Sequence, residues 1–176
     1  MQFLVVIRKL PVFLIYAVDC GRTRNTIPDW GPVMTVALFL HVFCAAAWTG
    51  CILVEALYEH SIDHSPTMRR FVSVLHWRTD KYVEVPALAG VLLSGGIMLA
   101  HADMTVMLWT KVALGLTAIA FNLACVVLVA RRLVAARADD FATWERLDHL
   151  QHKLGAVVLL ALVGALVIGG MVLAGR

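Results

Sequence analysis

Charged side chains are scarce in this sequence. Only 15% of its 176 residues are Asp, Glu, Lys or Arg, whereas 61% are hydrophobic. Soluble globular domains carry about 25% charged residues, so this composition excludes an ordinary soluble domain and indicates an integral membrane protein. The basic residues form no run interleaved with aromatic side chains. We therefore expect no nucleic-acid partner.

Closely spaced cysteine pairs are also missing, because the four cysteines form no Cys-x-x-Cys motif. Three of them, Cys44, Cys51 and Cys125, lie in apolar segments. Free cysteine behaves as a small hydrophobic residue. We therefore interpret these three as packing residues rather than as metal ligands or disulfide partners.

The N-terminal segment lacks the pattern of a signal peptide. The basic residues of a signal peptide precede its apolar stretch, but Arg8, Lys9 and Pro11 interrupt the apolar residues 1–18. We predict that residues 1–32 form a tail with an interfacial helix, and an additional span is the alternative. Residues 33–176 then form the transmembrane domain.

Four apolar segments are long enough to cross a membrane, which takes about 20 helical residues. They are residues 33–57, 83–102, 107–130 and 154–174. The second and third are separated only by a short stretch around "ADMT" and form a tight hairpin, whereas the other two connections are long and polar. The sequence predicts an all-α fold, a four-helix transmembrane bundle with helical cytoplasmic extensions.

Both long connections carry signals for the start of a helix. Ser65 is a candidate N-cap, and Pro66 follows it at the first helical position. Asp139 or Asp140 caps a second helix, which we expect to continue into the fourth span.

The basic residues predict the orientation. They gather in the two long connections, at Arg69, Arg70, Arg78, Lys81, Arg131, Arg132, Arg137, Arg146 and Lys153. Cytoplasmic connections are enriched in Lys and Arg, so we expect these connections in the cytoplasm and both termini outside. Basic residues in the tail, such as Arg22 and Arg24, favour the opposite orientation.

The first span aligns three polar or aromatic side chains on one stripe. His41, Trp48 and Glu55 follow one another at intervals of seven residues, which is close to two helical turns. Two further ionisable groups, His101 and Lys111, lie near the outer ends of the second and third spans. Because ionisable groups in a membrane are costly and usually functional, we expect His41, His101 and Lys111 to form one outer layer. We also expect Glu55 and Glu84 to face the bundle interior.

Histidines on facing helices of a bundle are typical of haem ligands. Ala87, Gly90 and Ser94 form a face of small residues on the helix of His101, which would leave room for a macrocycle or allow close helix packing. The alternatives for the polar groups are a structural, hydrogen-bonded His41 and a Lys111 that reaches the interface. On the third span the stripe that we expect to face inward contains Lys111, Gly115, Ala118, Asn122 and Cys125.

Two other groups of residues suggest metal binding. Five histidines lie toward the cytoplasmic side, at His60, His64, His76, His149 and His152. We interpret them as a solvated interfacial set, with a second cofactor near His76 or His152 as the alternative. His101, Met104 and Met107 would suit copper, because imidazole and thioether groups bind Cu(I).

The pattern His41–x6–Trp48–x–Gly50 resembles the first helix of a superfamily of small bacterial membrane proteins. This superfamily includes copper-resistance D-type proteins, protoporphyrinogen oxidases of the HemJ type and uncharacterised integral membrane relatives, which this chain resembles best. The stretch "WTKVALGLTAIAFN" is similar to the opening of the third helix in that superfamily. The resemblance implies haem b binding by His41 and Lys111. The oxidases have a tyrosine–histidine pair on this helix, where the chain has Phe121 and Asn122.

These observations lead to one expectation and two alternatives. We expect a b-type haem protein of the bacterial inner membrane that transfers electrons or acts as an oxidoreductase, with His41 and His101 as iron ligands. Lys111, Trp48, Gly90 and Ser94 would complete the cofactor site. The alternatives are a copper-handling protein and a non-catalytic membrane subunit or scaffold. Expected partners are the lipid bilayer, a quinone or redox protein, and further copies of the chain.

Overall fold

The structure is a computed structural model that describes residues 31–61 and 65–175, and every regular element within these ranges is helical. The elements are α2 (Gly31–Ser61), α3 (Pro66–Thr79), η2 (Asp80–Glu84), α4 (Val85–Leu99), α5 (Val106–Arg137) and α6 (Phe141–Ala174). The predicted all-α fold is confirmed. The predicted interfacial helix in residues 1–30 and the predicted role of His64 lie outside the described residues.

Within residues 31–61 and 65–175, four continuous helical segments are long and apolar enough to cross a membrane: α2, α3 to α4 (Pro66–Leu99), α5 and α6. In their most apolar stretches only 22–28% of the residues are buried inside the molecule. Most apolar side chains therefore point outward, which is the arrangement that lipid contact requires. The chain is a multi-pass membrane protein.

The helix-start signals in the sequence correspond to observed caps. The Ser65 hydroxyl accepts a hydrogen bond from the Met68 N–H, and Pro66 opens α3. Asp140 accepts a 3.0 Å hydrogen bond from the Thr143 N–H and caps α6, which continues without interruption into the fourth span. The predicted extensions are confirmed.

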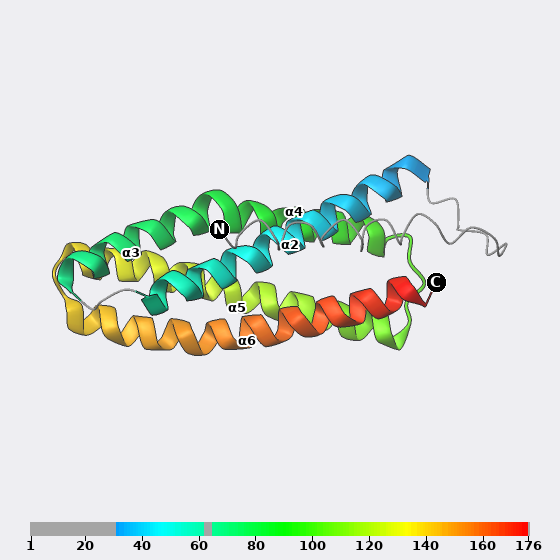
Figure 1. Cartoon of the computed structure of the whole chain (residues 1–176). Helices are drawn as coiled ribbons and strands as arrows, with labels where there is room; N and C mark the ends of the chain where they lie inside the picture. Colours follow the sequence, from blue (N-terminus) through cyan, green and yellow to red (C-terminus); the bar gives the residue numbers. More distant parts are fainter. Residues whose placement is uncertain (1–30, 62–64, 176) are drawn as a thin grey trace, which may run out of the picture. The chain divides into compact units, whose positions relative to one another are not determined.

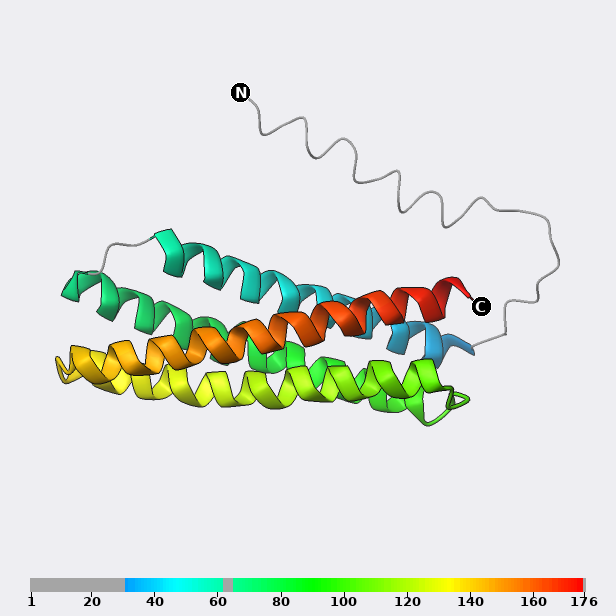
Figure 2. The same cartoon turned by 90° about the horizontal axis from the view of Figure 1, so that it is seen from below.

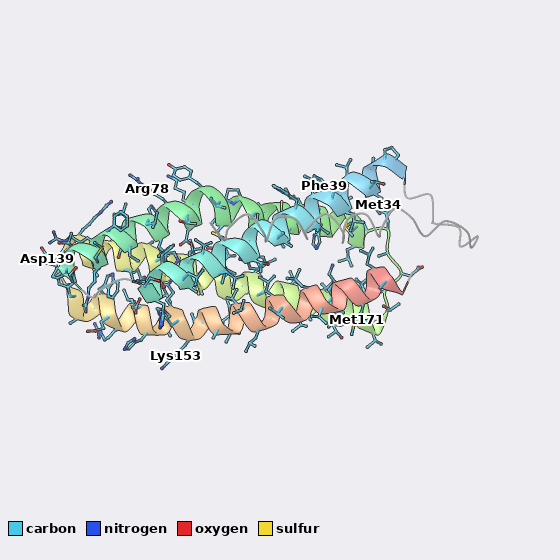
Figure 3. All side chains as sticks on the ribbon, viewed as in Figure 1. Met34, Phe39, Arg78, Asp139, Lys153 and Met171 are labelled. Atoms are coloured by element: carbon cyan, nitrogen blue, oxygen red, sulfur yellow. The ribbon has the colours of Figure 1, made fainter. Side chains whose placement is uncertain are left out.

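The helices meet at two ends of different composition. At one end, called the polar end, α2 ends, α3 begins and residues 138–140 connect α5 to α6. Residues 100–105 connect α4 to α5 at the other end, called the apolar end (Figures 1 and 2). Figure 3 shows Arg78, Asp139 and Lys153 toward the polar end and Met34 and Met171 toward the apolar end. Since α5 and α6 have 32 and 34 residues, they exceed the ~20 residues that a membrane core needs.

The central layer of the bundle is built from one large side chain and several small ones. Its buried residues are Trp48, Ala87, Leu88, Ala118, Ile119, Val158, Ala161 and Leu162. Alanine lets helix backbones approach closely where no water drives association. The Trp48 Nε1–H donates to Asn122 Oδ1 at 3.2 Å, so the one polar atom of this indole is satisfied within the core.

A π-helical turn joins α3 to α4, which the sequence analysis did not predict. The Val85 N–H bonds to the Asp80 carbonyl, five residues back. Pro86 has no N–H and disfavours a regular α-helical turn before it, and an inserted residue relieves this conflict. The turn leaves both Asp80 and Glu84 buried, at 1% and 3% exposed.

Candidate functional sites

His41 occupies the half of the bundle toward the apolar end and is half-buried. Its Nδ1 lies 3.2 Å from the Val91 carbonyl and 3.2 Å from the Ser94 hydroxyl. A carbonyl only accepts hydrogen bonds, so Nδ1 carries the proton. The other ring nitrogen, Nε2, makes no hydrogen bond with any described residue and is left as a lone-pair donor in the neutral ring.

Lys111 is also half-buried, and its side chain packs on α6. A Cβ atom built on Gly169 would lie 3.2 Å from Lys111 Cε, so this glycine makes room for the lysine. His41 and Lys111, two of the three residues expected in the outer layer, are thus both half-buried in the half of the bundle toward the apolar end.

His101 is exposed in the connection between α4 and α5. Its Nδ1–H donates to the Ile97 carbonyl of its own helix at 3.0 Å. Met104 and Met107, the other candidate copper ligands, are both 40% exposed. These three residues lie on the surface of the apolar end, whereas His41 and Lys111 are partly enclosed by the helices.

The small-residue face of α4 packs against α2. Ala87 and Ser94 are buried, and a Cβ on Gly90 would lie 2.4 Å from the Cys44 sulfur. Close helix packing, one of the two expected uses of this face, therefore occurs at Gly90. Beside the contact runs an open, apolar groove of about 470 Å³. It is lined by Pro32, Val33, Val36, Ala37, Leu40, Cys44, Gly90, Leu93, Ser94 and Ile97.

A second site lies toward the polar end, where five helical elements bury ionisable side chains against one another. We call this site the acidic network. It comprises Glu55, Glu59, His76, Asp80, Glu84, Arg132, Asp148 and Gln151. The prediction that Glu55 and Glu84 face the interior is confirmed, because they are only 6% and 3% exposed.

His76 is the centre of the acidic network and is 4% exposed. Its Nδ1–H donates to Glu59 Oε1 at 2.8 Å, while its Nε2 lies 3.2 Å from Glu55 Oε2 and 3.6 Å from Asp80 Oδ1. The Gln151 amide nitrogen lies 3.3 Å from the same Nε2. A neutral imidazole carries one proton, here on Nδ1, whereas a protonated imidazolium carries a second proton on Nε2, where it would face the carboxylates of Glu55 and Asp80.

Arg132 is the buried cation of the acidic network, at 1% exposed. Its Nη1 donates to Glu59 Oε1 at 2.9 Å and to the Gln151 side-chain oxygen, and its Nη2 lies 2.8 Å from Asp148 Oδ1. The guanidinium carbon also stacks 4.6 Å from the centre of the Trp144 ring. Arg132 therefore shares its single positive charge between Glu59 and Asp148, and it makes no ion pair with Glu55, Asp80 or Glu84.

The interpretation of the five histidines as a solvated set was wrong for His76. His60, His149 and His152 are exposed as expected, but His76 is enclosed by carboxylates from α2 and η2. The sequence alone offers no reason to separate them, because His76 is buried by contacts with residues of other helices, among them Glu55, Glu59 and Gln151.

The sequence analysis also missed Arg132 and treated it only as a topology signal. The inward stripe on α5 that begins at Lys111 and includes Asn122 and Cys125 continues at regular spacing to Val129 and Arg132. Extending that stripe by two turns would have placed Arg132 in the interior. The inward stripes of α2 and α5 therefore contribute to both sites. His41 and Lys111 lie toward the apolar end, and Glu55 and Arg132 lie toward the polar end.

In comparisons with known proteins, no family model, no curated protein and no solved structure matches the chain.

Proposed function

We propose that this protein binds one b-type haem in the membrane and transfers single electrons, with His41 as an iron ligand. The observation that carries the proposal is the hydrogen bond from His41 Nδ1–H to the Val91 carbonyl. Histidines that ligate a metal almost always donate their other ring N–H to a carbonyl or carboxylate. Bound haem would supply a one-electron oxidation and reduction of its iron.

Lys111 is the better second haem-binding group. Lys111 is half-buried in the same half of the bundle as His41, whereas the His101 ring is exposed and turned back to Ile97. This choice departs from the order that the sequence suggested, in which His101 came before Lys111. It agrees with the assignment that the superfamily resemblance implies.

His41 is suited to bind haem iron, whereas the face of small residues on α4 offers less space for the haem ring than the sequence suggested. His41 Nε2 has no competing hydrogen bond from a described residue, and Ser94 both supports His41 and lines the apolar groove. The space next to Gly90, however, is filled by Cys44 and is not available to a macrocycle. Trp48 packs the central layer and is fully buried, so its role is structural.

The protein would lie in the bacterial inner membrane with its polar end in the cytoplasm. The two long connections, which are rich in Lys and Arg, lie at the polar end, and cytoplasmic connections are enriched in these residues. Its electrons would pass to or from a membrane quinone or a redox protein. Apolar side chains cover the outside of the four spans, which leaves room for contact between copies of the chain.

An absorption spectrum of the purified protein tests the proposal. Full-length protein made with an ample haem supply should show a Soret band and sharp α and β bands after reduction. His41→Ala should remove or shift these bands. His149→Ala, a substitution of an exposed histidine, is the matched control and should leave them unchanged. Thermal unfolding of each variant separates loss of the ligand from loss of the fold.

The same spectra distinguish Lys111 from His101 as the second haem ligand, and they test the alternatives of copper handling and a non-catalytic subunit. Lys111→Met should shift the bands and His101→Ala should not. Protein that is colourless after haem supplementation would refute the haem function. Copper retained by such protein and lost in the Met104→Leu, Met107→Leu double variant would support copper handling. Protein that binds neither haem nor copper would favour a non-catalytic subunit.

A further inference from the structure

Glu55, His76 and Asp80 direct potential metal ligands at one small volume inside the bundle. They come from α2, α3 and η2, and each is less than 9% exposed. One ligand atom from each lies within 4.8 Å of the other two. His76 Nε2 is 3.2 Å from the Glu55 carboxylate and 3.6 Å from that of Asp80. Atoms bound to one tetrahedral Zn²⁺ lie about 3.3–3.4 Å apart, so this spacing suits a shared ion.

The orientation of His76 is fixed as in known metal sites. Its Nδ1–H donates to Glu59 at 2.8 Å, and Arg132 holds Glu59 from the other side at 2.9 Å. A carboxylate that accepts the outer N–H of a histidine sets the tautomer and makes the inner nitrogen a better ligand. The lone pair of His76 Nε2 therefore points to the side where Glu55 and Asp80 lie.

Asp80 gives independent support for a ligand. Its side chain is 1% exposed, and neither of its carboxylate oxygens has a hydrogen-bond partner among the described residues. Glu84 lies on the same π turn and is buried as well, at 3% exposed. Isolated buried carboxylates are strongly unfavourable, and Arg132 is engaged with Glu59 and Asp148 instead. A divalent cation between Glu55 and Asp80 would neutralise both.

We infer that Glu55, His76 and Asp80 bind one divalent first-row transition-metal ion, for which Zn²⁺ is the representative probe. One imidazole and two carboxylates are a common donor set for such ions. Glu84 or a water molecule is the fourth ligand, and Glu59 is a positioning residue that acts through His76. The site is separate from the proposed haem site, because it uses other residues toward the other end of the bundle.

Metal binding is measured on full-length protein in detergent, purified without a histidine tag and stripped with EDTA. Titration calorimetry should show one Zn²⁺ per chain, and Zn²⁺ should raise the unfolding temperature because it binds only the folded state. Co²⁺ in its place should give the visible absorption bands of a tetrahedral site. Asp80→Asn and His76→Gln should remove all three signals.

Two variants give graded controls. Glu59→Gln should weaken Zn²⁺ binding by about 10–100-fold without changing the stoichiometry, as expected of an outer-shell partner. His149→Gln changes an exposed histidine of α6 and should have no effect. Asp80→Asn removes one of several buried carboxylates that lie close together, so this variant should fold at least as well as metal-free wild type.

The inference is overturned by wild-type protein that binds no Zn²⁺ and shows no Zn²⁺-dependent rise in unfolding temperature. Protons would then neutralise Glu55 and Asp80. Equal binding by wild type and Asp80→Asn would also overturn it, because it would place the ion elsewhere. Neither outcome depends on whether the protein contains haem.

Discussion

At the scale of single residues, the buried guanidinium of Arg132 makes the sharpest stability prediction. Arg132→Met should destabilise the protein by about 3–5 kcal/mol, because it leaves the buried Glu59 and the partly buried Asp148 without their cation. Methionine keeps the apolar contact with Trp144, so the loss reports charge rather than volume. The change is measured by unfolding in a detergent titration.

Arg131 is the matched control because it is adjacent in sequence but exposed. Arg131→Met should change the free energy of unfolding by no more than about 0.5 kcal/mol. Equal losses for the two variants would show that positive charge at the end of α5, rather than the ion pairs of Arg132, stabilises the molecule.

These residues also show how far a stripe in the sequence can be followed. The regular spacing of His41, Trp48 and Glu55 correctly predicted one inward face, and the same rule extended along α5 reaches Arg132. The spacing of residues along a helix predicts which of its faces points inward, but not which residues of other helices that face contacts. That His76 would lie between Glu55 and Asp80 depended on packing between three elements, which no single helix pattern contains.

At the scale of helices, the contact between α2 and α4 depends on one glycine. Gly90→Leu should destabilise the protein by about 1–3 kcal/mol, because Cys44 already occupies the space that a side chain would enter. Gly96 on the same helix has no atom within 4 Å of its Cβ position, so Gly96→Leu should be neutral or stabilising. Unfolding in detergent measures both, and similar values would contradict close packing at Gly90.

Helix starts were predictable for a local reason, whereas the π turn was not. Ser65 and Asp140 each cap a helix through a hydrogen bond to a residue three positions on, which the sequence itself encodes. At Pro86 the sequence shows that a regular helix is strained but not how the strain is relieved. A kink, a break and an inserted residue all relieve it, and only the last buries Asp80.

At the scale of the whole molecule, the basic residues predict which end of the bundle lies in the cytoplasm. Arg70, Arg78 and Lys153 are exposed toward the polar end, while residues 100–105 at the apolar end contain no Lys or Arg. Arg132 counts less in this comparison than its place in a basic connection suggested, because its charge is compensated inside the acidic network. The remaining excess of exposed Lys and Arg at the polar end still predicts that this end lies in the cytoplasm.

Truncated fusions test this orientation. A reporter that is fluorescent only in the cytoplasm should be bright after Asp139 and dark after Asp103, and a phosphatase active only outside should give the reverse. The basic residues of the tail, such as Arg22 and Arg24, favour the opposite result, so the comparison should be repeated with both changed to Gln. That change should leave the pattern as it was, since the exposed basic residues near Asp139 outnumber them. A phosphatase signal after Asp139, with and without the two Gln substitutions, would show that the orientation is the opposite of the predicted one. The half-buried His41 and Lys111 would then lie toward the cytoplasm, and the acidic network toward the outside.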